Sequence, residues 1–188
     1  MSASVTALLV IDAQESFRQR DHWSETDAAP YVERQQALID GAVAQGLPVL
    51  QVFHEETGGP FDPASGFVRT LEPLHIEPNA VFRKQRHSAL VGTGLDVYLV
   101  SRGIRRLLIS GLRTEQCCET TTRHASDLGF EVDFVSEATH TLAMTAPGGG
   151  LVTAGEIKWR TELVLADRFA RVVTVEQALA DSLGRKAA

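Results

Sequence analysis

The sequence predicts an α/β protein of three layers, α-β-α, in which helices cover both faces of a central parallel sheet of about six strands. Three observations support this class. Short apolar runs alternate with segments of helical spacing along the chain of 188 residues. Some of these runs, such as Val5–Ile11, are almost wholly apolar, which is typical of strands buried on both faces of a parallel sheet. Glycine follows several of the helical segments, where it commonly ends a helix.

Taken in order, strands and helices alternate along the chain. The strands are predicted at residues 5–11, 47–53, 80–82, 107–109, 130–135 and 169–173. The helices are predicted at residues 31–45, 95–101, 115–128, 151–165 and 175–183, with Gly46, Gly103 and Gly129 after the first three. Right-handed crossovers through these helices make the strands parallel. We expect a single domain, residues 1–188, with a sizeable core.

The connections at residues 18–30, 55–79 and 136–150 are predicted as irregular loops. The second is rich in glycine and proline. A loop of that length inside a compact domain is usually functional or a lid. We therefore expect the first two loops to decide which substrate is accepted.

Composition argues against several classes of function. A net charge of −6 disfavours nucleic acid as a partner. Cys117 and Cys118, the two cysteines, are adjacent and cannot build a disulfide framework, so an oxidising compartment is not indicated. The start of the chain has no signal-like segment, and no stretch is long enough to cross a bilayer. We expect a cytoplasmic protein that binds neither nucleic acid nor membrane.

Cys117 lies where a helix is predicted to begin. With Thr114 as the N-cap, Cys117 is in the first turn, where backbone N–H groups lack partners and the helix dipole favours an anion. We therefore expect a lowered pKa for Cys117, whose thiolate would be a nucleophile. Cys118 is rotated by about 100°. It is interpreted as a small buried hydrophobic residue on the face that packs on the sheet, with Thr122, Ala125 and Leu128.

Three chemically different side chains each follow a predicted strand: Asp12, Lys84 and Cys117. Because the carboxyl ends of parallel strands meet at one edge, we expect these side chains to converge. A carboxylate, an ammonium group and a thiol at one point make a nucleophilic site, with a base for the thiol and a cation that favours the thiolate. Gln14 and Phe17 closely follow Asp12 and are expected to line the same crevice.

These segments resemble the isochorismatase-like cysteine hydrolases, and the resemblance covers nearly the whole chain. It rests on LLVIDAQESF around Asp12, on FRKQRHSALVGTGLD around Lys84 and on ISGLRTEQCCETTTRHASDLGF around Cys117. It implies a Rossmann-type sheet of strand order 3-2-1-4-5-6. It also implies an Asp-Lys-Cys triad in which Cys117 is the nucleophile, Asp12 accepts and returns the proton, and Lys84 orders the pair.

Further expectations come from the same resemblance. Family members include nicotinamidases, N-carbamoylsarcosine amidases, ureidoacrylate amidohydrolases and isochorismatases. A cis peptide is implied between Leu112 and Arg113, with the N–H groups of Arg113 and Cys117 as oxyanion-hole donors. The implied reaction is attack on an amide or carbamoyl carbonyl of a small molecule, loss of ammonia or an amine, and hydrolysis of the thioester. A homodimer or homotetramer is also implied.

The chain departs from the family pattern at several positions. Cys118 stands where the family usually has valine, which leaves open which thiol reacts. Leu90 replaces the phenylalanine of the SAF motif and is expected to widen the substrate pocket. The Asp-x-His metal pair of nicotinamidases reads Val52-x-His54 here. We therefore expect no metal and no other cofactor.

Three further side chains are considered around the pocket. His54 is interpreted as a substrate contact or a structural hydrogen bonder. Trp23 is considered as an aromatic wall of the substrate pocket. The role of His140, just after a predicted strand, is left open.

Alternatives of other classes remain at the level of sequence. An isochorismatase-type reaction cleaves a vinyl ether and does not require a cysteine. A vicinal Cys117–Cys118 pair is also compatible with a thiol redox protein, although Asp12 and Lys84 then have no role. A non-catalytic binding protein is the third alternative. The substrate itself is not predicted.

Overall fold

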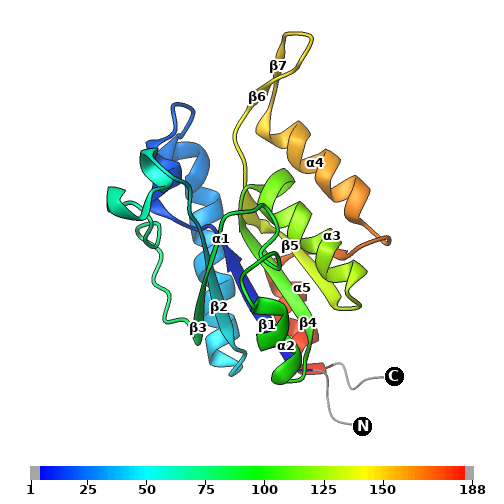
Figure 1. Ribbon diagram of the computed structural model, residues 1–188. Helices are drawn as coiled ribbons and strands as arrows, with labels where there is room; N and C mark the ends of the chain where they lie inside the picture. Colours follow the sequence, from blue (N-terminus) through cyan, green and yellow to red (C-terminus); the bar gives the residue numbers. More distant parts are fainter. Residues whose placement is uncertain (1–4, 185–188) are drawn as a thin grey trace.

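A six-stranded parallel sheet forms the centre of the protein in the computed structural model, which describes residues 5–184 (Figure 1). Its strands are β1 (Val5–Ile11), β2 (Val49–His54), β3 (Ala80–Lys84), β4 (Ile104–Leu112), β5 (Glu131–His140) and β8 (Arg171–Val173). They pair in the order β3-β2-β1-β4-β5-β8, and each neighbouring pair is parallel. The predicted order is confirmed. The sixth strand is labelled β8 because a short antiparallel pair, β6 (Met144–Thr145) and β7 (Leu151–Val152), precedes it.

Helices cover both faces of this sheet. Two of them, α1 (Glu25–Ala44) and α5 (Val175–Gly184), share one core with the sheet. The other face is covered by α2 (Leu95–Ser101), α3 (Glu119–Asp127) and α4 (Ala154–Leu165). In Figure 1, α2 and α3 lie in front of the sheet and α1 lies behind it. The three-layer prediction is therefore confirmed.

The central strand β1 shows why its sequence is apolar throughout. Ala7, Leu9 and Ile11 belong to the core beneath α2, whereas Leu8 and Val10 belong to the core beneath α1. All five are fully buried. Because side chains alternate between the faces of a strand, a strand covered on both faces needs apolar residues at every position.

Several element boundaries differ from the predictions. α1 begins at Glu25 rather than at residue 31, because the Ser24 hydroxyl accepts a hydrogen bond from Asp27 N and caps the helix ahead of Pro30. β4 runs from Ile104 to Leu112 and so extends beyond both ends of the strand predicted at residues 107–109. β5 continues to His140, into the stretch predicted as a loop. α4 begins three residues later than predicted, with Thr153 as its N-cap in a capping box.

The long connection at residues 55–79 contains two short 3₁₀ turns, Gly59–Phe61 and Pro63–Ser65. It is tied to the start of the chain, because Leu71 N donates to Ala13 O at 2.9 Å and Glu72 N donates to Glu15 Oε1 at 2.7 Å. The loop is therefore anchored against the carboxyl edge of β1.

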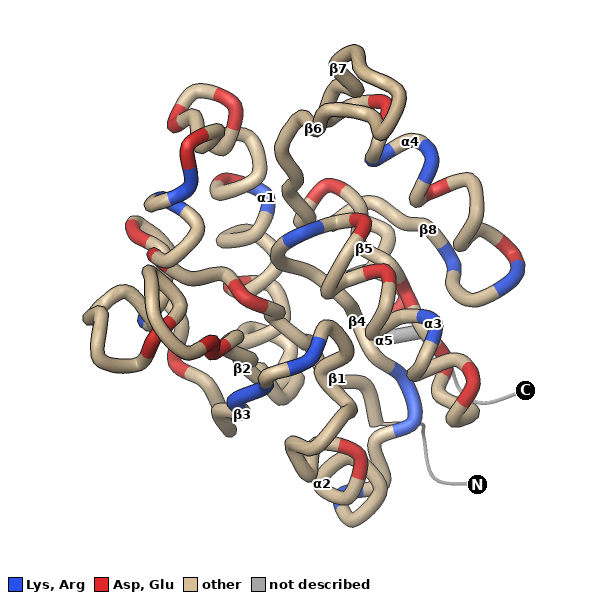
Figure 2. Tube along the Cα trace, turned by 45° about the horizontal axis from the view of Figure 1, so that its top comes forward, with Lys and Arg blue, Asp and Glu red and all other residues tan. Residues whose placement is uncertain are grey.

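Charge is spread over the molecule. In the view of Figure 2, acidic and basic residues are interspersed along the elements. None of the described helices combines the length and the apolar character needed to cross a bilayer.

Candidate active site

Three strand ends place Asp12, Lys84 and Cys117 together at the carboxyl edge of the sheet. Asp12 follows β1 directly, Lys84 is the last residue of β3, and Cys117 lies in the turn after β4. β2 lies between β1 and β3, so the long side chain of Lys84 passes the end of β2 to reach Asp12. The sequence prediction that these residues converge agrees with these positions.

The Lys84 ammonium group holds the centre of the cluster. Its Nζ lies 2.8 Å from Asp12 Oδ2, 3.0 Å from His54 Nδ1 and 3.3 Å from Cys117 Sγ. An ammonium group has three N–H donors, so these three partners account for all of them. The side chains of Lys84 and Asp12 are completely buried. Among the described residues, neither Asp12 oxygen accepts a hydrogen bond of good geometry besides this ion pair.

Burial dominates the proton affinities of this cluster. It raises the pKa of Asp12, although Lys84 opposes the effect. It would lower the pKa of Lys84, but Asp12 and Cys117 outweigh it and the pKa is raised. Burial, followed by the Asp12 carboxylate, raises the pKa of Cys117 to about 12. The predicted lowering of the Cys117 pKa is therefore wrong, because the ammonium group does not compensate for desolvation beside a carboxylate.

His54 is held in one tautomer. An ammonium group can only donate, so His54 Nδ1 accepts from Lys84 and His54 Nε2 carries the proton. Nε2 then donates to Glu56 Oε1 at 3.0 Å. Burial, followed by Lys84, lowers the pKa of His54, which favours the neutral imidazole. The chain Asp12–Lys84–His54–Glu56 thus runs from the buried carboxylate to the cavity rim.

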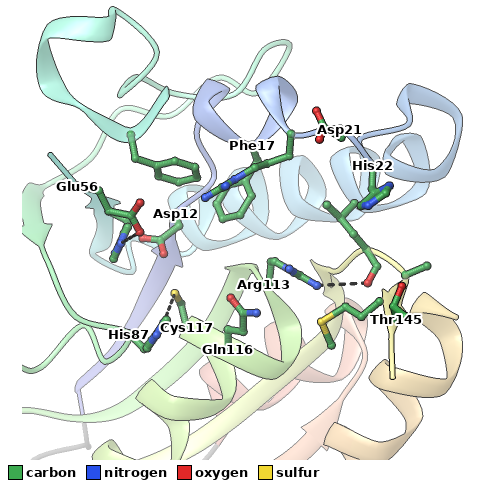
Figure 3. A pocket seen from close by; sticks show the side chains of 16 residues that line it. Asp12, Phe17, Asp21, His22, Glu56, His87, Arg113, Gln116, Cys117 and Thr145 are labelled. Carbon is green, nitrogen blue, oxygen red and sulfur yellow. Dashed lines mark hydrogen bonds and ion pairs between the residues drawn. The ribbon is translucent and has the colours of Figure 1, made fainter. Parts of the chain in front are cut away.

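A cavity of about 510 Å³ opens above Asp12 and Cys117. Figure 3 shows Asp12 and Cys117 close together at one end, while Arg113, His22 and Thr145 lie toward the other. Two predicted substrate contacts, Phe17 and His54, line this cavity. Its remaining lining residues are Arg20, Asp21, His22, Glu56, Phe61, His87, Arg113, Gln116, Leu142, Ala143, Met144 and Thr145.

Three predicted substrate contacts do not line this cavity. Gln14 uses its amide group on the main chain of His54, donating to His54 O at 3.1 Å and accepting from His54 N at 2.8 Å. Trp23 packs edge-on against His140, with ring centroids 5.6 Å apart. Leu90 is buried in the core that contains α2. Gln14 therefore positions the main chain of His54.

His87 is the main residue that sequence reasoning missed. Its Nδ1 lies 3.8 Å from Cys117 Sγ, and its ring lies parallel to that of His54 at 6.4 Å. It comes three residues after Lys84, inside the second motif that carries the family resemblance. That proximity in sequence was the available signal. Glu56, two residues after His54, was missed in the same way.

The turn that carries Cys117 is wider than predicted. Residues Thr114–Cys118 form a π-helical turn, in which Cys118 N donates to Arg113 O at 3.2 Å, and α3 begins only at Glu119. Arg113, not Thr114, is the N-cap, because the Thr114 hydroxyl donates to Thr139 Oγ1 at 2.9 Å. The peptide between Leu112 and Arg113 is cis.

Cys118 is buried as predicted, at 0% exposure in the same core as Ala125. Burial raises its pKa well above the usual range. Leu128, expected on the same buried face, is instead exposed at the carboxyl end of α3. Within the described part of the chain, no group of three or more His, Cys, Asp and Glu side chains is arranged to hold a metal ion.

Fold and cavity together define an α/β enzyme whose site lies at the carboxyl edge of a parallel sheet. The sequence model of the Isochorismatase domain matches residues 6–177, and the protein belongs to this family of hydrolases.

Individual relatives agree with this assignment. The isochorismatase family protein YrdC of Bacillus subtilis is 26% identical over 178 residues, covering 93% of this chain and 95% of the relative. Ureidoacrylate amidohydrolase RutB of Stutzerimonas stutzeri is 25% identical over 177 residues, covering 74% of this chain and 71% of the relative. The crystal structure of an isochorismatase from Pseudomonas putida superposes with a TM-score of 0.84 at 27% identity, covering 92% of this chain and 89% of that chain.

Proposed function

We propose that this protein is a cysteine hydrolase that cleaves an amide or carbamoyl C–N bond of a small molecule through a thioester on Cys117. The observation that carries the proposal is the shared ammonium group. Lys84 Nζ holds the Asp12 carboxylate at 2.8 Å and the Cys117 sulfur at 3.3 Å at one end of a cavity. The relative RutB is named an amidohydrolase, which supports the same reaction class.

The first step transfers a proton as the sulfur attacks. The raised pKa of Cys117 keeps its thiol protonated at rest, and Asp12 is the neighbouring base. As the S–H proton moves to Asp12, sulfur bonds to the carbonyl carbon and the C=O electron pair moves to oxygen. The raised pKa of Asp12 favours this transfer because it makes the carboxylate a stronger base.

The second step releases the amine. The oxyanion collapses, the C–N bond breaks, and the leaving nitrogen takes the proton from Asp12. Water then attacks the thioester, giving up a proton through Asp12 to the departing sulfur. We assign oxyanion stabilisation to the N–H groups of Arg113 and Cys117. We assign to Lys84 the role of holding the Asp12 carboxylate and the Cys117 sulfur next to each other.

Two histidines complete the proposed site. His54, fixed between Lys84 and Glu56, orients the ammonium group. His87 borders the sulfur from the open side of the cavity and is placed to contact the leaving group. The cavity volume of about 510 Å³ suits a small organic molecule.

The test is a screen of small primary amides and carbamoyl compounds for ammonia release, with isochorismate as a vinyl-ether control. We expect turnover of at least one C–N substrate and none by Cys117→Ala, together with an acyl-enzyme mass on Cys117 in rapid quench. Hydrolysis of isochorismate alone, or turnover that survives Cys117→Ala, contradicts the proposal.

We also propose that the enzyme works in the cytoplasm as a homodimer or homotetramer and binds neither nucleic acid nor membrane. The family resemblance and the net charge of −6 support this. Light scattering at micromolar concentration tests the oligomeric state, and a monomeric mass contradicts the proposed homo-oligomer.

A further inference from the structure

The turn that carries Cys117 sends two further polar side chains into the reaction cavity. Arg113 and Gln116 both line it, and in Figure 3 the side chains of Cys117, Gln116 and Arg113 follow one another along one side of the cavity. The proposed hydrolysis uses the backbone N–H of Arg113, but it gives no role to the Arg113 guanidinium group or to the Gln116 amide. These two groups are therefore candidates for binding the part of the substrate that does not react.

Three contacts orient the Arg113 guanidinium group. Its Nε donates to Thr141 Oγ1 at 3.3 Å, and its Nη2 donates to Leu142 O at 3.3 Å and lies 3.1 Å from Glu115 Oε1. The Thr141 hydroxyl donates to Glu115 Oε2 at 2.5 Å, so the carboxylate is held as well. The guanidinium group is therefore positioned without a ligand, which lowers the cost of binding one.

One nitrogen of this guanidinium group has no partner. Nη1 of Arg113 makes no hydrogen bond to any described residue, and it is not one of the buried side-chain atoms that lack a partner, so it is open to solvent. The Gln116 amide likewise makes no hydrogen bond within the described part of the chain and is not closed off. Because both residues line the reaction cavity, each offers N–H donors to a molecule bound there.

The charges around the cavity favour a neutral partner for these donors. Glu115 already balances the charge of Arg113. At the rim, the cation of Arg20 is opposed by Asp21 and Glu56. A carboxylate on the substrate would lose its hydration without meeting an unbalanced cation, whereas a carbonyl oxygen accepts the same N–H groups at a smaller desolvation cost. The developing oxyanion would also repel a second negative charge in the same cavity.

We propose that the substrate is a small neutral amide with a second carbonyl group, whose oxygen accepts hydrogen bonds from Arg113 Nη1 and Gln116 Nε2. The inference rests on the proposed hydrolysis, which places the reacting carbonyl at Cys117. Phe17 and Phe61 line the same cavity edge-to-face, with ring centroids 5.1 Å apart, and suit a hydrocarbon link between the two carbonyl groups. Diamides such as succinamide are the simplest compounds of this class.

The experiment is an NMR titration of the isotope-labelled Cys117→Ala protein with three probes that have the same number of non-hydrogen atoms. Succinamide carries the second carbonyl, succinamate has a carboxylate in its place, and 4-methylpentanamide has an apolar group there. With succinamide we expect saturable shifts of the Gln116 side-chain amide. Succinamide should bind about tenfold more tightly than 4-methylpentanamide, as expected for hydrogen bonds from a charged group. It should also bind more tightly than succinamate.

Matched variants in the same background show which donors act. Arg113→Met should weaken succinamide binding about tenfold and leave 4-methylpentanamide binding within about twofold. Gln116→Met should cost succinamide a few-fold. The control is Arg105→Met, which removes an exposed cation on β4 and should change nothing. If Arg113→Met does not fold because Glu115 is left unpaired, Arg113→Met combined with Glu115→Gln replaces it.

Glu115→Gln alone tests the charge argument. This change keeps the Arg113 guanidinium group but removes the carboxylate that balances it. The preference should therefore reverse, with succinamate binding more tightly than succinamide. A merely structural role of Glu115 would weaken both probes alike.

Tighter binding of succinamate by the parent protein overturns the proposal, as does an unchanged preference after Glu115→Gln. Succinamide binding that survives Arg113→Met overturns it too. The NMR readout needs no turnover, so it separates this inference from the proposed hydrolysis. A failed amide screen together with Arg113-dependent binding of succinamide would contradict the hydrolysis and not the recognition of the second carbonyl.

Discussion

Two adjacent thiols occupy different environments in this protein. Cys117 lines the reaction cavity and is 5% exposed, whereas Cys118 is completely buried. Burial raises the pKa of both. The two thiols therefore differ because Cys117 is accessible from the cavity and has Asp12 and Lys84 as neighbours. The difference does not depend on Cys117 being a thiolate at rest.

Alkylation by iodoacetamide should follow this difference. Because the thiolate is the nucleophile and the pKa of Cys117 is raised to about 12, we expect slow labelling at pH 7. The rate should rise by about tenfold per pH unit between pH 7 and 10. Mass spectrometry should place the label on Cys117. Labelling of Cys118 first, or a rate independent of pH, contradicts this.

Substitutions should separate the two cysteines further. Cys117→Ala should abolish hydrolysis while the circular dichroism spectrum is retained. Cys118→Val exchanges one small apolar side chain for another of similar volume, so turnover should stay within a few-fold. An active Cys117→Ala enzyme would assign the nucleophile to another residue.

At the scale of elements, Gly111 sets how closely β4 approaches β1. Its φ is +119°, and a Cβ added there would lie 1.8 Å from the backbone oxygen of Ile11. A backbone atom in the middle of the sheet cannot move aside as a side-chain tip can. The glycine is therefore needed for strand packing directly before the turn that carries Cys117.

Gly111→Ala should lower the free energy of unfolding by about 2–5 kcal/mol, combining left-handed backbone strain with a steric clash. Gly129→Ala is the matched control, because its φ is +86° but nothing lies within 4 Å of an added Cβ. It should cost about 1–2 kcal/mol. Urea unfolding measures the free energy of unfolding of both variants. Equal losses of stability would show that the structure relaxes around the added Cβ at residue 111.

At the scale of the whole molecule, His140 should link stability to pH. Its pKa is lowered from 6.5 to about 4, so the unfolded chain takes up a proton near pH 6.5 while the folded protein does not until about pH 4. Stability is therefore fully present above pH 6.5 and falls as the pH drops toward 4. The loss is up to about 3 kcal/mol at 1.36 kcal/mol per pKa unit.

Urea unfolding between pH 7 and 4 should show this loss, and His140→Gln should reduce the slope. His75→Gln is the control, because the His75 side chain is 81% exposed. An unchanged slope in His140→Gln would assign the acid sensitivity to other groups.

Removal of metal ions should leave the enzyme active. Val52 occupies the position of a metal-binding aspartate in nicotinamidases, and we expect no metal to be needed. Activity should survive dialysis against a chelator. Loss of activity that zinc or iron restores would contradict this expectation.

Much of the fold could be predicted from the sequence because its signals are local. The apolar run of β1 indicated a strand buried on both faces, and the alternation of strands and helices indicated a parallel sheet. Element ends were less predictable. α1 starts at Glu25, directly after its N-cap Ser24, and β5 runs to His140, because capping contacts and strand pairing decide these boundaries.

By itself, the sequence determined that Asp12, Lys84 and Cys117 would meet, because the carboxyl ends of parallel strands share one edge. Only the tertiary structure decided the state of that site. The pKa of Cys117 depends on how deeply the thiol is buried and how near Asp12 lies, and neither can be read from spacing along a chain. The same holds for His140, at the end of β5, and Lys158, on α4, which line one cavity although they are far apart in the sequence.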